Sequence, residues 1–472
     1  MTDREPGPAP GGRAVPATTD GVRGRAPIRR RVVDAARRQR ARPAARVLAG
    51  SLVGQGLVVA ASPLVARLYG PADLGALAVV TALSSVVGAV APLGLDRAIA
   101  VPRGEAASRL LVALAVASTT VVVVAATLVA LSARHDLARW WGASVLVDAW
   151  WACPVTIAAV AFQRIVTAQL ARRRDWPALA RRSVLQGAGQ VACTLVLAPL
   201  GGSLGLVLGL AAGRVAALAG SLPVRRRRRP GARPPTPDGG DRRRRAVPRI
   251  RLLLAVAARY RRFPLVTTWS SLLNVAGQQA PLLVLSALHG APALGALALA
   301  LRVLGAPVGM VADAVGLQVE GQVGAVARAR TGGLAPALRR LLVPLALLAL
   351  AGGTAAAVLS PPLFPVLFGQ RWASAGTIAV LLAPAFAAQI VASPLSRLLP
   401  LLERQGLQLS WDALRLVATS GAIVAVSLGG ADVTVAVAAW SAASVVRYAV
   451  LLVVVARSAA HADRAARGRL GA

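Results

Sequence analysis

Residues 68–78 read LYGPADLGALA and residues 288–298 read LHGAPALGALA, so one pattern occurs twice, once in each half of the chain. The same register aligns Ser51 and Leu52 with Ser271 and Leu272 without a gap. Each copy follows one long apolar segment and opens the next. Alanine and leucine runs match one another easily, but the corresponding positions make this repeat informative. It predicts a chain built from two related halves.

Long apolar segments alternate with short charged ones on both sides of the repeat. Of the 472 residues, 56% are hydrophobic and 15% charged, whereas soluble domains carry roughly 25% charged residues. A run of about 20 apolar residues crosses the hydrocarbon core as a helix. We predict an all-α membrane protein with about twelve transmembrane helices. The predicted spans are 47–66, 75–95, 110–131, 144–163, 183–200, 204–222, 264–286, 294–316, 341–358, 375–396, 411–428 and 433–455.

The distribution of arginine predicts how these spans are oriented in the membrane. All 54 basic residues are arginine, and 46 of them fall in alternate connecting segments and the two tails. The opposite segments hold only Arg67, Arg134, Arg139 and Arg371, and the other four lie inside spans. Basic residues concentrate on the cytoplasmic side of membrane proteins. Both termini are therefore predicted to be cytoplasmic, with an even number of helices.

Composition then divides the chain into five predicted parts. They are a disordered Arg/Pro-rich cytoplasmic tail (1–43), a first six-helix lobe (44–222), a basic cytoplasmic loop (223–263), a second six-helix lobe (264–456) and a C-terminal tail (457–472). The loop reads as a flexible linker that anionic phospholipid holds at the membrane surface. Two lobes in the same orientation predict a pseudo-two-fold axis along the membrane normal, with a substrate site between them.

Catalytic and cofactor signals are missing from the sequence. It contains no Walker A pattern, and its three histidines lie far apart without partner cysteines. Cys153 and Cys193 lie in apolar segments, which predicts buried thiols. The formal charge of +36 would favour nucleic acid in a soluble chain, but here it follows arginine usage between membrane spans. We predict no enzyme activity, no cofactor, no metal site and no nucleic-acid partner.

Polar residues inside the predicted spans are the candidate substrate-binding residues. Arg302 lies about eight residues into the eighth span, roughly 12 Å deep at 1.5 Å per residue. Asp313 and Glu320 continue the same helical stripe. A charge facing lipid at that depth costs at least about 2.5–3.5 kcal/mol, so the stripe is expected to face a wet cavity or to form a structural ion pair. The predicted substrate-binding set is Arg302, Asp313, Gln55, Asn274 and Gln278.

Other intramembrane polar residues have structural interpretations. Arg214 and Arg447 occupy matching places in the last helix of each half and are expected to snorkel inward. Asp412 and Arg415 are expected to form an interfacial pair. Polar pairs such as Gln186/Gln190 and Gln389/Ser393 suit interhelical hydrogen bonds, and together they supply the groups that a sugar-binding cavity needs.

Several motifs between about residues 45 and 456 carry a family resemblance. They are LYGPADLG (68–75), LDRAIAVP (95–102), RYRRFP (259–264), LFGQRW (367–372) and SPLS (393–396). In this order, on a twelve-helix frame, the sequence resembles the oligosaccharide flippase (polysaccharide biosynthesis protein) family of the multidrug/oligosaccharidyl-lipid/polysaccharide exporter superfamily.

The resemblance implies two six-helix lobes in a V-shaped, MATE-like arrangement around a cationic cavity. It implies transport of an undecaprenyl-diphosphate-linked oligosaccharide across the bacterial cytoplasmic membrane, with glycosyltransferases or a polymerase of the same pathway as partners. Among intramembrane arginines, Arg302 best matches the position expected to hold the diphosphate. The alternatives are a small-molecule or drug antiporter of the same fold, a membrane polysaccharide polymerase or ligase, and a non-transporting scaffold.

Overall fold

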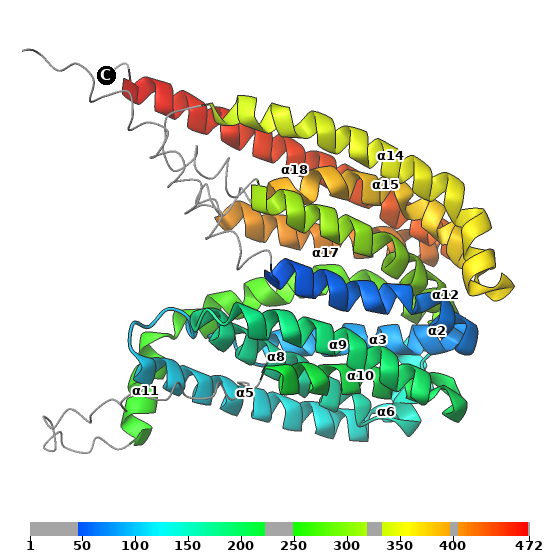
Figure 1. Ribbon diagram of the computed structural model, residues 1–472, viewed down its shortest axis with the longest axis horizontal. Coiled ribbons are helices and arrows are strands. Elements are labelled where there is room, and N and C mark those ends of the chain that lie inside the picture. The colour runs from blue at the N-terminus through cyan, green and yellow to red at the C-terminus, as the bar shows by residue number, and fades with distance from the viewer. Residues whose placement is uncertain (1–45, 222–248, 319–332, 397–404, 471–472) are drawn as a thin grey trace, which may run out of the picture. The chain divides into compact units, whose positions relative to one another are not determined.

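The computed structural model describes residues 46–221, 249–318, 333–396 and 405–470. All regular elements in these ranges are helical. The predicted N-terminal tail, most of the basic loop and Glu320 lie outside the described residues. From Val47 onward the described chain forms one compact unit, and the long helices of each half lie alongside one another in it (Figure 1).

The first half contains six helices of membrane-crossing length. They are Arg46–Leu68, which includes α2 (Ser62–Leu68), then α3 (Pro71–Val90), α5 (Glu105–Ser132), α8 (Ala152–Arg172), α9 (Trp176–Val196) and α10 (Gly202–Gly220). Short helices α4 (Leu95–Ala98), α6 (Arg134–Trp141) and α7 (Val145–Asp148) connect them. Because α6 and α7 occupy 134–148, the fourth long helix begins at Ala152, later than the predicted residue 144.

The second half follows α11 (Arg249–Arg259), a helix within the segment predicted as a loop. Its long helices are α12 (Thr268–Gln318), α14 (Leu334–Phe368), α15 (Ala373–Ser396), α17 (Gln405–Leu428) and α18 (Val433–Leu470). The backbone of α12 breaks at Gly290, because its φ of 82° is not a helical value. The element α12 therefore consists of two consecutive helices.

The helix count agrees with the prediction of about twelve. Ten segments of the described chain are long and apolar enough to cross a membrane. One of these ten, Phe263–Ala312, spans the break at Gly290 and contains two helices. The 21-residue α9 is of membrane-crossing length but is not among the ten. Counting both brings the described chain to twelve long helices.

Helix α9 begins earlier than the sequence predicted, at Trp176 instead of residue 183. Asp175 caps it by accepting a hydrogen bond from the Ala178 amide at 3.2 Å, and Pro177 stands in its first turn. The early start brings Arg182 into the helix. The prediction had placed this residue in a connecting segment.

The repeat seen in the sequence is a symmetric contact in the structure. A Cβ added to Gly75 would lie 1.8 Å from the carbonyl oxygen of Ala291, and one added to Gly295 would lie 1.8 Å from that of Pro71. Pro71 and Gly75 are the repeat equivalents of Ala291 and Gly295. Helices α3 and α12 therefore pack backbone to backbone across a pseudo-two-fold axis, which confirms the predicted duplication.

A second pair of equivalent contacts lies at the turns that precede these glycines. The hydroxyl of Tyr69 donates to the Thr194 carbonyl on α9 at 2.9 Å. His289, its repeat equivalent, bonds through Nε2 to the Ser427 hydroxyl on α17 at 2.8 Å. In both halves, the turn after the first helix is thus tied to the fifth helix.

The LFGQRW motif contacts the residues just before the LYGPADLG motif. Trp372, completely buried, donates from Nε1 to the Ala66 carbonyl at 2.8 Å, and Arg371 donates to the same carbonyl at 2.8 Å. Arg67 donates in return to the Val366 carbonyl at 3.2 Å. The LFGQRW motif of the second half therefore holds the end of α2 in the first half.

Replacing Tyr69 by phenylalanine is expected to destabilise this turn. Burial raises the pKa of the Tyr69 phenol above 10.0, so the hydroxyl stays protonated and donates. Its loss leaves a buried carbonyl without its donor, which costs about 1–3 kcal/mol. We expect a lower Tm for detergent-solubilised Tyr69→Phe. Tyr260→Phe is the control, since the half-buried Tyr260 hydroxyl has no hydrogen-bond partner in the described chain; equal Tm values for the two variants would contradict this role.

The outward faces of the bundle are apolar. On α5, Val121, Val124 and Leu128 are more than half exposed, as are Val343 and Leu350 on α14. Exposed apolar surface of this extent is unusual in soluble monomers and suits contact with lipid tails. Both helices also meet the length and hydropathy of a membrane span.

Candidate functional site

The first cavity lies between helices of the first half and the second part of α12. Its volume is about 510 Å³, within the range of small-molecule sites. Its polar lining comes from the first helix, α3, α9 and α12, and consists of Ser51, Gln55, Thr81, Arg182, Ser183, Gln186, Gln190 and Arg302. Two of the predicted substrate-binding residues, Gln55 and Arg302, therefore share one cavity.

Arg302 is the unpaired cation of this cavity. It lies on α12 and lines the cavity with a partly exposed side chain. Within the described chain it has neither a hydrogen bond nor an ion pair. A guanidinium offers five N–H donors in a planar fork, so Arg302 is free to take an anionic oxygen ligand.

A hydrogen-bond network supports the opposite wall. Arg214 on α10 donates to Gln163 Oε1 at 3.2 Å, and Gln163 Nε2 donates to Gln186 Oε1 at 2.5 Å. Arg182 donates to the Thr167 hydroxyl. These partners are neutral, so the network orients Arg182 and Arg214 without cancelling their charge.

The electrostatic character of the cavity follows from its residues. Its described lining contains two arginines and no carboxylate. Asp96 on α4, outside this lining, is paired with Arg164 at 2.8 Å. With low-dielectric walls, such a site concentrates anions.

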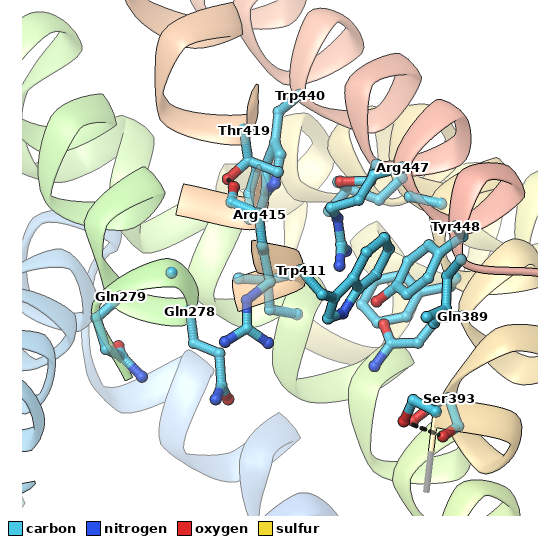
Figure 2. A pocket seen from close by; sticks show the side chains of 18 of the residues that line it. Gln278, Gln279, Gln389, Ser393, Trp411, Arg415, Thr419, Trp440, Arg447 and Tyr448 are labelled. Atoms are coloured by element: carbon cyan, nitrogen blue, oxygen red, sulfur yellow. Dashed lines mark hydrogen bonds between the residues drawn. The ribbon is translucent and has the colours of Figure 1, made fainter. Parts of the chain in front are cut away.

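The second cavity, of about 490 Å³, lies within the second half (Figure 2). Its charged and amide groups are those of Gln278, Gln279, Gln389, Arg415 and Arg447, and four aromatic side chains join them: Phe386, Trp411, Trp440 and Tyr448. Leu301 on α12 lines both cavities, so they share one wall. The described lining again contains no carboxylate.

The two arginines of this cavity differ in their surroundings. Arg415 lies 3.5 Å from Asp412 and also donates to the Asn274 carbonyl, which agrees with the predicted Asp412–Arg415 pair. Arg447 is 6% exposed, and its guanidinium carbon lies 4.9 Å from the Trp411 ring centroid and 4.0 Å from that of Tyr448. Arg447 therefore does not snorkel to an aqueous surface, because the two rings hold it against the cavity.

The structure separates the predicted substrate-binding residues. Gln278 lines the second cavity. Asn274 stands beside it, donating to Asp412 at 3.2 Å and accepting from Gln278 at 3.1 Å. The side chain of Asp313 lies outside the described residues. The set thus divides between two cavities, and its role in substrate binding stays a prediction.

Sequence reasoning missed Arg182, Arg415 and Arg447 as cavity residues. A signal for them existed in their spacing, because Arg182 stands as far before Arg214 as Arg415 stands before Arg447. The predicted helix began at residue 183, so Arg182 was assigned to a connecting segment outside the membrane and its spacing to Arg214 was not interpreted.

Comparisons with known proteins agree with this architecture. Residues 64–236 match the family described as Polysaccharide biosynthesis protein. Lipid II flippase MurJ in an inward closed conformation superposes with a TM-score of 0.65 at 12% identity, covering 88% of this chain and 89% of that one. An inward-facing multidrug resistance MATE family transporter of the MOP superfamily gives 0.61 at 16% identity, covering 89% and 96%. A MOP superfamily transporter from Pyrococcus furiosus gives 0.51 at 14%, covering 91% and 95%. No curated protein sequence matches the chain.

The fold defines a class: a helical protein with many apolar helices of membrane-crossing length, arranged in the MATE-like fold of these solved structures. The match of residues 64–236 to the polysaccharide biosynthesis protein family agrees with the resemblance carried by the motifs.

Proposed function

We propose that this protein is a flippase that moves an undecaprenyl-diphosphate-linked oligosaccharide across the bacterial cytoplasmic membrane by alternating access, for the synthesis of cell-surface polysaccharide. Its tails and basic loop face the cytoplasm in this proposal, as the arginine distribution favours. The observation that carries it is the first cavity, where Arg302 and Arg182 face amide groups with no carboxylate in the described lining.

This chemistry suits a lipid-linked diphosphate. Planar guanidinium groups bind phosphate oxygens through paired, charge-assisted hydrogen bonds. Gln55, Gln186 and Gln190 offer both donors and acceptors to sugar hydroxyls. A polyprenyl tail can remain in the bilayer while the polar headgroup crosses through the cavity.

The same charge argues against the runner-up, a MATE-like exporter of cationic drugs. A cationic ligand in a cavity with unpaired arginines meets like charge without a compensating carboxylate, which costs binding free energy. An antiporter of anionic small molecules fits the same charge, and movement of a lipid-linked disaccharide in the experiment below favours the flippase over it.

Reconstitution into proteoliposomes tests the proposal. A fluorescent undecaprenyl-diphosphate-linked disaccharide in both leaflets is exposed to a membrane-impermeant quencher. We expect wild-type vesicles to lose the inner-leaflet signal as well, while protein-free vesicles retain it. Retained inner-leaflet signal together with proton- or sodium-driven accumulation of ethidium would instead establish a drug antiporter.

A further inference from the structure

Arg447 is a buried cation that the structure leaves without an acceptor. Its relative exposure is 6%, and no hydrogen bond or ion pair to it exists in the described chain. Its Nε is buried from solvent and has no hydrogen-bond partner in the described chain. In Figure 2 the guanidinium lies beside the rings of Trp411 and Tyr448, at the edge of the cavity that it lines.

The two rings position the Arg447 side chain, but they do not accept hydrogen bonds from its N–H groups. Cation–π contacts use the faces of the guanidinium, whereas its N–H donors lie in the plane and need acceptors. Burying a charge without such partners is strongly unfavourable. The aromatic cage therefore holds Arg447 with its donors available to a ligand.

The position of Arg447 is duplicated in the fold. One sequence offset relates Arg182 to Arg415 and Arg214 to Arg447, and it also relates Thr194 to Ser427, which anchor the equivalent turns. In all four arginines the buried Nε lacks a hydrogen-bond partner. The corresponding Arg214 has Gln163 as an acceptor; Arg447 has none in the described chain.

The charge of the second cavity defines what it can accept. Arg415 is paired with Asp412, so one uncompensated positive charge remains, on Arg447. A single planar carboxylate matches one guanidinium bidentately. Around it, Trp411, Trp440 and Tyr448 present rings while Gln278 and Gln389 present amides, a mixture that suits the apolar faces and hydroxyls of sugar rings.

We propose that the second cavity binds the carboxylate of an acidic sugar, with Arg447 as its ligand, and thereby selects cargo whose glycan carries a uronate. This inference rests on the proposed function, because it assigns a subsite to the glycan of the same cargo. The first cavity holds the diphosphate, and the shared wall at Leu301 places the two charged groups of one molecule in adjacent sites.

Calorimetry on the detergent-solubilised full chain tests the site without transport. We expect a glucuronate-containing disaccharide to bind and its neutral glucose counterpart to bind at least about 10-fold more weakly. Arg447→Gln lowers the affinity for the acidic disaccharide about 10- to 100-fold, the range for hydrogen bonds to charged groups, while Arg447→Lys has a smaller effect. The exposed Arg340 on α14 supplies the control, Arg340→Gln, with unchanged affinity.

Three results would overturn the inference. They are equal binding of the two disaccharides, an acidic preference that survives Arg447→Gln, and inorganic phosphate displacing the uronate with higher affinity, which would make this a phosphoryl site. A stability readout separates ligand binding from a structural role. Without ligand, Arg447→Gln is expected to keep or raise the Tm because an unpaired buried charge is removed, whereas a clearly lower Tm would assign Arg447 to packing.

Transport distinguishes this inference from the proposed function. In the proteoliposome assay, wild type is expected to move a uronate-bearing lipid-linked disaccharide faster than a neutral one, and Arg447→Gln to equalise the two rates. Equal wild-type rates would reject the acidic-sugar site alone. Movement of neither cargo would reject the proposed function.

Discussion

Alanine at Gly75 is expected to slow transport strongly, although it adds one methyl group. That methyl would lie 1.8 Å from the Ala291 carbonyl oxygen and 2.6 Å from its carbon. These are backbone atoms and cannot turn aside, so α3 and α12 must separate. Overpacking of this kind costs about 1–3 kcal/mol or more, which lowers the population of the arrangement in which α3 and α12 are in contact about 5- to 150-fold. A cycle that needs this arrangement slows accordingly, and Gly295→Ala should act in the same way.

The proteoliposome assay measures the rate, and thiol labelling measures the contact. Leu294→Cys, at a completely buried position, should react with an impermeant maleimide only when Gly75→Ala is also present, in a background where Cys153 and Cys193 are alanine. Gly421→Ala is the control, because a Cβ there meets nothing within 4 Å. Transport and labelling like wild type in the Gly75→Ala variant would show that the halves do not need this close contact.

Loss of the Arg302 side chain is expected to reduce transport at least about 100-fold. Each hydrogen bond to a charged group is worth about 1.5–3 kcal/mol, and a diphosphate can take two from one guanidinium. Arg302→Ala removes both and leaves a cavity with less positive charge. Arg302→Lys should recover part of the rate, because the ammonium keeps the charge but loses the planar fork.

Arg340→Ala controls for the loss of one arginine elsewhere in the second half. Membrane insertion of each variant is checked by its yield and its elution from a sizing column. Arg302 sits in no ion pair in the described chain, so its replacement should leave the fold intact. Wild-type rates in a well-folded Arg302→Ala variant would remove this residue from the mechanism.

The large-scale fold was accessible from sequence because it depends on patterns that repeat. Run length gave the helices, and the copies at Gly75 and Gly295 gave the two halves. The exact partner of each glycine was not accessible, since only the folded chain brings Pro71 beside Gly295. The start of the helix at 176–182 was missed because Arg181 and Arg182 lower the hydropathy of this segment, although Asp175 and Pro177 form a recognisable N-terminal signal.

The candidate site was only partly accessible for a similar reason. Arg302 stood out because it interrupts an apolar run, and the structure places it with Gln55 in one cavity. Arg447 interrupts a run too, yet its sequence position fits snorkelling equally well. Its true environment depends on Trp411, which lies on another helix far away in the sequence, and no local pattern reveals that contact.

Photo-crosslinking with a lipid-linked cargo tests the central claim most directly. The probe is an undecaprenyl-diphosphate disaccharide with a photoreactive group beside the diphosphate, flashed in proteoliposomes and mapped by mass spectrometry. The account predicts crosslinks on α12 around Arg302 and on α9 between Arg182 and Gln190, and their loss with excess unlabelled cargo. Crosslinks confined to lipid-facing residues such as Val121 and Leu128 of α5 would contradict it, because the diphosphate would then not enter the first cavity.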